Sequence, residues 1–194
     1  MTMRLFIGVD FEPAVKKSIE ACQSQLTPLS LKGRWKTEDN FHLTLRFMGE
    51  FDENDLPRLY DALSGCADTI SPFELHLGKI GAFDLKKGEE TWAVRVLWVG
   101  VEGDMKALNE LYFSVEYALE SKGFPKDFRP YAPHITLGQD LKFNCDFDLI
   151  KKASECLDQN INVDCITVFH SESIEGRRVY TPIKRFDIGK MKVD

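Results

Sequence analysis

The stretch "NFHLTLRFMGE", residues 40–50, alternates apolar and polar side chains. Because successive side chains of a β-strand point to opposite faces, the alternation predicts a strand with one buried face. His42, Thr44 and Arg46 would share the other face. The apolar face would consist of Phe41, Leu43, Leu45 and Phe47. The stretch therefore predicts a half-buried strand that presents an imidazole and a hydroxyl side by side.

The same arrangement returns in "YAPHITLGQD", residues 131–140, where His134 and Thr136 would share the polar face of a second strand. The two histidines are 92 residues apart (134 − 42), one in each half of the chain. This recurrence indicates a weak internal duplication, with two similar lobes that face each other.

The remaining pattern predicts the fold class. Apolar residues at helical spacing predict helices at 13–26, 55–67, 104–123 and 146–158. Further strands are predicted at 3–9, 73–80, 91–101, 161–170 and 178–186, with turn-rich residues at 81–90. Because several strands adjoin without an intervening helix, we expect an α+β fold with mainly antiparallel sheets. No linker divides the chain, so we expect one bilobal domain, residues 1–194, with the site in a cleft between pseudo-symmetric lobes.

The charge balance limits the possible partners. A net charge of −6 argues against a protein that coats nucleic acid by bulk electrostatics, which needs a basic face. A local basic pocket for one phosphate or one RNA end stays possible. The candidate donors are Arg34, Lys36, Arg46, Arg129, Arg177 and Arg178.

The cysteines and histidines give no sign of a metal site. The five cysteines form no CxxC pair, and the four histidines lack ligand spacing, so we expect no bound metal or other cofactor. The odd number of cysteines and the absence of a signal-peptide pattern favour free thiols in a reducing cytoplasm. No apolar run approaches the roughly 20 residues needed to span a bilayer, so no membrane association is expected.

Two histidines and two threonines in one cleft suit phosphoester chemistry without a metal. In-line displacement at phosphorus needs a base behind the attacking oxygen and an acid beside the leaving oxygen. A histidine pKa near 6.5 lets one imidazole be neutral and the other protonated near neutral pH. Threonine hydroxyls can donate hydrogen bonds to the non-bridging phosphate oxygens. No GxSxG elbow or phosphate-binding P-loop occurs in the sequence.

At these residues the chain resembles the two-histidine phosphoesterase superfamily, which is defined by two HxTx motifs. "HLTL" at 42–45 and "HITL" at 134–137 both match. The chain looks most like the RNA 2′,3′-cyclic phosphodiesterases, historically called 2′-5′ RNA ligases. The likeness covers nearly the whole chain, because segments such as "RLFIGVDF", "RWKTEDNFHLTLRFMGE" and "GFPKDFRPYAPHITLG" follow in the expected order.

The resemblance implies a bilobal fold, no required metal, and opening of a 2′,3′-cyclic phosphate to a 2′-phosphate. The substrates would be RNA 3′ ends or small cyclic nucleotides, with no obligate protein partner. By position, His42 would be the proton donor to the leaving oxygen and His134 would activate water. Thr44 and Thr136 would hold the phosphate. The donor and the acceptor could be exchanged for another substrate or in the reverse reaction.

This sequence departs from the family pattern near the second motif. Relatives often carry an Arg two places after the motif's Leu, where this chain has Gln139, and a basic residue where it has Ala132. An amide lacks the bidentate, charge-assisted hold on phosphate that arginine gives. Arg46, Arg129 and Arg177 are the candidates to compensate.

Two alternative functions stay open. One is a phosphodiesterase for another cyclic or 2′-5′-linked nucleotide, and the other is a non-catalytic RNA-end-binding module of the same fold. A structural or adaptor protein would bind no phosphate at all.

Four further residues are assigned from their context. His76 is expected to be a solvated bystander. His170 ends a late strand that could border the cleft, but a substrate contact is not expected of it. Tyr131 and Trp98 are either core residues or stacking platforms for a base.

Overall fold

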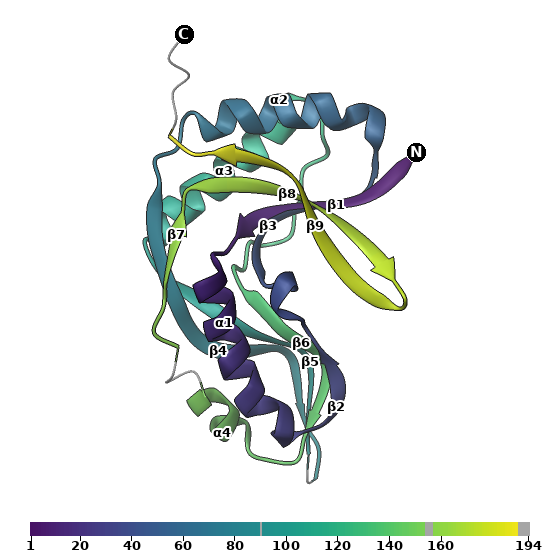
Figure 1. Ribbon diagram of the computed structural model, residues 1–194, viewed down its shortest axis with the longest axis vertical. Helices are drawn as coiled ribbons and strands as arrows, with labels where there is room; N and C mark the ends of the chain where they lie inside the picture. The colour runs from purple at the N-terminus through teal and green to yellow at the C-terminus, as the bar shows by residue number, and fades with distance from the viewer. Residues whose placement is uncertain (90, 154–156, 190–194) are drawn as a thin grey trace.

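The computed structural model describes residues 1–89, 91–153 and 157–189, and they form an α+β fold of two antiparallel sheets (Figure 1). The four-stranded sheet has the order β3 (His42–Asp52), β1 (Thr2–Asp10), β8 (Cys165–Ile174), β9 (Arg177–Asp187). The five-stranded sheet has the order β2 (Ser30–Trp35), β6 (Ile135–Phe143), β5 (Trp92–Gly103), β4 (Phe73–Lys87), β7 (Asn160–Val163). The α+β class and the antiparallel pairing predicted from the sequence are confirmed.

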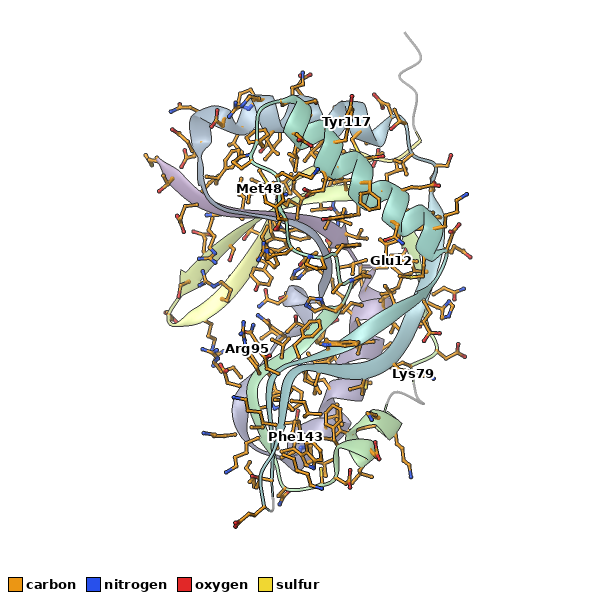
Figure 2. The ribbon with its side chains drawn as sticks, turned by 180° about the vertical axis from the view of Figure 1, so that it is seen from behind. Glu12, Met48, Lys79, Arg95, Tyr117 and Phe143 are labelled. Atoms are coloured by element: carbon orange, nitrogen blue, oxygen red, sulfur yellow. The ribbon has the colours of Figure 1, made fainter. Side chains whose placement is uncertain are left out.

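Helices complete two lobes. In one lobe α2 (Leu56–Ala67) and α3 (Met105–Ser121) pack on each other and on the four-stranded sheet. In the other, α1 (Pro13–Leu26) and α4 (Phe147–Lys152) lie along the five-stranded sheet (Figure 1). Figure 2 labels Met48 in the first lobe and Phe143 in the second. None of the described helices combines the length and apolar character needed to cross a bilayer.

The helices form where the sequence predicts them, for identifiable reasons. Pro13 occupies the first turn of α1, where a missing N–H costs nothing, and Val15 and Ile19 are buried at helical spacing. The Asp104 carboxylate caps α3 by accepting a hydrogen bond from the backbone N–H of Ala107 at 2.9 Å. Gly123, with φ of 79°, follows the end of α3.

The chain exchanges strands between its two sheets. If β2 and β7 are left aside, the order β1-α1-β3-α2-β4 recurs as β5-α3-β6-α4-β8. However, β4 pairs in the sheet of β5 and β6, and β8 pairs in the sheet of β1 and β3. The sheet order β3-β1-β8-β9 therefore matches β6-β5-β4-β7, with a motif strand first in each. Only β2 has no counterpart among the described strands.

Parts of the expected secondary structure differ from the observed one. Residues 81–87, expected as turns, extend β4, because Phe83 and Leu85 continue its pairing with Val96 and Val94 of β5. The strand expected at 161–170 is interrupted at Asp164, so β7 and β8 enter different sheets. Strand β2 was not predicted, since its sequence does not alternate.

The helix predicted at 146–158 is shorter than expected. It is observed as α4, and residues 154–156 of the prediction lie outside the described residues.

Arg46 does not share the face of His42 and Thr44, so its predicted placement is wrong. The register of β1 against β3 shifts between Ile7 and Gly8, and the resulting bulge turns Arg46 toward α3. Its side chain is 7% exposed and forms an ion pair with Glu116 and a hydrogen bond with the Pro125 carbonyl.

The same bulge changes the face of the residue that follows Arg46. Phe47, expected in the core, is 52% exposed beside Phe6, with ring centroids 6.0 Å apart. Arg46 therefore anchors the motif strand to α3 and is not available to bind phosphate.

We predict that Arg46→Met destabilises the fold by about 3–5 kcal/mol, because removing one partner leaves the buried Glu116 carboxylate uncompensated. Urea unfolding measures the loss. Arg46→Met combined with Glu116→Leu is the control and should recover most of the stability, since no charge remains buried. A loss below about 1 kcal/mol in the single variant would contradict this account of the strand.

Candidate functional site

Both motif histidines lie at the starts of corresponding strands. His42 is the first residue of β3, and His134 immediately precedes β6. Residues of these two strands approach one another with Cα–Cα distances of 8 Å or less. The four residues predicted to form the site, His42, Thr44, His134 and Thr136, are all half-buried.

Gly8 of β1 allows the strand of the first motif, β3, to lie close to β1. It pairs with Thr44 on one side and Thr167 on the other. A Cβ at this position would come within 2.5 Å of the Leu43 carbonyl oxygen. The absence of a side chain therefore allows β3 to approach β1 closely beside the motif.

Hydrogen bonds fix the tautomer of His42. Its Nδ1 lies 2.8 Å from the Asn40 carbonyl oxygen, which can only accept, so Nδ1 carries the proton. Its Nε2 lies 3.0 Å from the Thr44 hydroxyl, which donates to it in the neutral form. Burial, helped by the positive charges of Lys36 and His134, lowers the pKa of His42 to about 4, although the Asn40 hydrogen bond opposes the shift.

Aromatic rings surround the His42 imidazole. Phe6 lies 4.5 Å away between ring centroids, and Tyr180 packs edge-on at 5.1 Å. Phe169 stacks on Phe6 at 4.8 Å. These rings restrict the orientation of the imidazole and supply the low-dielectric surroundings that disfavour its charged form.

His134 has a matching environment in the other lobe. Its Nδ1 lies 2.7 Å from the Ala132 carbonyl oxygen, so Nε2 is again the nitrogen left for chemistry. Phe83 packs edge-on at 4.9 Å, and the Trp98 ring lies at 6.4 Å. Burial lowers the pKa of His134 as well. Trp98 lies flat over Gly81, where a Cβ would come within 2.2 Å of the indole.

The two imidazoles are electrostatically coupled, because a proton on His134 lowers the pKa of His42. Thr136 lies opposite Trp98 in the pairing of β6 with β5. The structure therefore brings both histidines into one electrostatic environment, each with its threonine two residues on.

Three of the six candidate cations, Arg34, Arg46 and Arg129, are engaged with carboxylates. The Arg129 guanidinium holds the Asp127 carboxylate, with Nε–Oδ1 and Nη2–Oδ2 distances of 2.9 and 2.6 Å. Arg34 pairs with Asp140. Arg177 and Arg178 are exposed on β9.

Lys36 differs from these cations. It is half-buried, its charge acts on His42, and its Nζ donates a hydrogen bond to the Tyr180 hydroxyl at 3.2 Å.

Two other candidate residues lie away from the motifs. His76 is half-exposed and lies 3.7 Å from Glu102, consistent with a bystander. His170 pairs with Leu5, one position along from the Phe6–Phe169 pair, so it points to the face opposite His42.

Tyr131 and Trp98, the two residues considered for base stacking, have different surroundings. The Tyr131 ring stacks on Tyr112 at 4.0 Å and packs against the core, so that face is not free for a base. Trp98, in contrast, is half-buried beside His134.

Sequence reasoning missed Phe6, Phe83 and Tyr180 as part of the site. Each lies in a strand whose aromatic and apolar residues indicate core packing equally well. The only available signal was their alternation, which does not say which face meets the other lobe.

The arrangement provides two imidazoles whose Nδ1–H is bonded to the main chain and whose Nε2 can exchange a proton, together with two hydroxyls, one of each from each lobe. Such a pair can move a proton on to one oxygen and off another. Among the described residues, no three His, Cys, Asp or Glu side chains converge as metal ligands would.

Sequence relatives agree with this geometry. A protein named RNA 2′,3′-cyclic phosphodiesterase from Methanocaldococcus jannaschii is 31% identical, with 84% of this chain and 83% of that protein covered. One of the same name from Archaeoglobus fulgidus is 31% identical, with 78% and 81% covered. Another, from Geobacillus stearothermophilus, is 35% identical over 69% of this chain but only 41% of that protein.

Solved structures share the fold. A Thermus thermophilus protein has a TM-score of 0.76 at 23% identity, with 96% of this chain and 98% of that chain covered. Escherichia coli LigT complexed with NADP+ has a TM-score of 0.69 at 25% identity, with 97% and 98% covered.

A family model described as LigT like phosphoesterase matches residues 9–91, which include the first motif. The M. jannaschii and A. fulgidus alignments extend the similarity over most of the chain. The chain therefore belongs to the LigT-like phosphoesterase family.

Proposed function

We propose that the chain hydrolyses RNA or nucleoside 2′,3′-cyclic phosphates to 2′-phosphates without a metal, within one bilobal domain of residues 1–194. The observation that carries the proposal is the pair of imidazoles, each with Nδ1–H committed to a main-chain carbonyl and Nε2 left for proton transfer. The relatives named RNA 2′,3′-cyclic phosphodiesterase support the substrate class, and the NADP+ complex of E. coli LigT supports a nucleotide ligand.

In the proposed reaction, water attacks phosphorus on the side opposite the 3′-oxygen. The Nε2 of His134 removes a proton from the water, and the P–O3′ bond breaks. The Nε2 of His42 delivers a proton to the departing 3′-oxygen. Thr44 and Thr136 hydroxyls donate hydrogen bonds to the non-bridging oxygens, where negative charge increases.

The electrostatics of the free protein bear on which histidine holds the proton. Because the pKa of His42 is lowered the more strongly, the first proton bound as the pH falls goes to His134. The anionic phosphate of a bound substrate raises the pKa of His42 and allows it to serve as the acid. Without that contribution, the roles of the two histidines would be exchanged.

A cytoplasmic location is part of the proposal. Cys66, Cys145 and Cys165 carry free thiols, which persist in a reducing compartment.

We predict that His42→Asn and His134→Asn each lower kcat for a nucleoside 2′,3′-cyclic phosphate by about 10²–10⁴-fold, because each removes one proton-transfer group. Chromatographic separation of the 2′- and 3′-phosphate products measures the rate and the bond broken. His76→Asn is the matched control and should leave the rate unchanged, since His76 lies at Glu102, away from both motifs. Wild-type rates in both motif variants would refute the mechanism.

The pH profile provides a second test. In the proposed mechanism the active protein carries one proton on the pair His42 and His134. Activity therefore falls below about pH 4, where His42 also becomes protonated. It falls again above the pKa of His134, which lies below 6.5. We therefore predict a bell-shaped kcat/KM profile with its maximum between these limits. A profile measured in buffers of constant ionic strength with its maximum above pH 7 would contradict the proposed electrostatics.

A substrate panel tests the reaction class. With EDTA present throughout, we expect turnover of an oligonucleotide that ends in a 2′,3′-cyclic phosphate. The panel should also contain a 2′-5′-linked dinucleotide and a 3′,5′-cyclic nucleotide. Faster turnover of either would reassign the substrate, and tight binding without turnover over hours would indicate a non-catalytic RNA-end-binding module. Loss of all turnover in EDTA, restored by a divalent cation, would overturn the metal-free mechanism.

A further inference from the structure

The two halves of the site are not equivalent, because β2 lies on the outer edge of β6 and the corresponding edge of β3 has no such strand among the described residues. Strand β2 pairs with β6 through Arg34–Gln139 and Trp35–Gly138. Lys36 follows directly. The unmatched strand therefore delivers one lysine to the boundary between the two motif strands.

The main chain of Lys36 is tied to the second motif. Its N–H donates to the Leu137 carbonyl oxygen at 2.8 Å. The buried Gln23 amide donates to both carbonyls, at 2.8 Å to Lys36 and 3.0 Å to Leu137. The backbone of Lys36 is thus fixed relative to the His134 motif.

The side chain of Lys36, in contrast, reaches the first motif. Its Nζ lies 3.2 Å from the Tyr180 hydroxyl and 5.3 Å from the centroid of that ring. The Tyr180 ring packs against both Phe6 and His42. Lys36 therefore connects the two lobes beside the His42 imidazole.

Asn40 positions Tyr180, the residue that accepts the hydrogen bond from Lys36. It is 7% exposed, and its Oδ1 accepts a hydrogen bond from the Tyr180 N–H at 3.2 Å. Its Nδ2 donates to the Arg178 carbonyl at 2.7 Å, and its own carbonyl accepts from His42 Nδ1. One buried residue thus fixes both the imidazole and the tyrosine.

Lys36 is a cation with unused capacity. Within residues 1–89, 91–153 and 157–189 it forms no ion pair with a carboxylate, whereas Arg46, Arg129 and Arg34 do. An ammonium group has three donors, and Tyr180 takes one of them. Gln139 is uncharged, so it cannot supply a positive charge near the second motif.

We propose that the Lys36 ammonium and the Tyr180 hydroxyl form an anion-binding pair that holds a non-bridging oxygen of the substrate phosphate beside His42. The inference rests on the proposed function for the identity of the substrate. The pair supplies a charge-assisted hydrogen bond and positive charge where a phosphodiester anion would lie between the two imidazoles. Its lysine directly follows β2, which has no counterpart among the described strands, and its tyrosine lies on β9 of the other lobe.

Binding of a nucleoside 2′-monophosphate, the proposed product, tests the pair independently of turnover. Because a hydrogen bond to a charged group is worth about 1.5–3 kcal/mol, Lys36→Met should weaken binding by about 10- to 100-fold in calorimetry. Inorganic phosphate should show the same loss. Tyr180→Phe should weaken both ligands less, since the ammonium remains.

Lys32→Met is the matched control. Lys32 lies on the same strand, is exposed, and pairs with Lys142, so its replacement should leave both affinities unchanged. Lys36→Arg, which keeps the charge, should recover part of the affinity and shows that a loss in Lys36→Met does not arise from misfolding.

The outcomes separate this inference from the proposed function. Turnover by the wild-type protein with equal KM and product affinity in Lys36→Met would overturn the inference and leave the proposed function intact. Absence of wild-type turnover, with phosphate binding that still depends on Lys36, would support the anion-binding pair while the proposed function fails. Equal losses in Lys36→Met and Lys32→Met would also overturn the inference, because a general charge effect would then explain them.

Discussion

Each motif histidine donates a hydrogen bond from Nδ1 to a main-chain carbonyl two residues earlier, and the proposed chemistry depends on these two hydrogen bonds. They select the tautomer, orient the ring and leave Nε2 to exchange a proton. Burial among aromatic rings then lowers both pKa values and favours the neutral form of each imidazole. A bound anion would oppose this shift and favour protonation.

The repeated motif gives two similar half-sites, but the surroundings make them different. His42 has the larger pKa shift, and Lys36 is one of the causes. His134 lies beside Phe83 and Trp98, with burial as the main cause of its smaller shift. Burial is the main cause of the larger His42 shift, and the charge of Lys36, which directly follows β2, adds to it.

Local periodicity predicted much of the fold, because helix and strand patterns depend on neighbouring residues. The two motifs, the antiparallel α+β class and helix α3 all follow from such patterns. The orientation of Arg46 could not be predicted from such patterns, since it depends on a bulge set by the register of β3 with β1. The break at Asp164 likewise depends on long-range pairing, because β7 and β8 belong to different sheets. Tyr180 joins the site through Asn40, 140 residues earlier, and no local pattern encodes such a contact.

The exchange of β4 and β8 has a consequence for how the chain can be divided. Residues 1–89 contain β1, β3 and β4, but β4 belongs to the sheet of the other half. Neither half can therefore complete its own sheet, and each leaves a strand without its neighbours. Two separately expressed halves would have to assemble with each other to bury these edges.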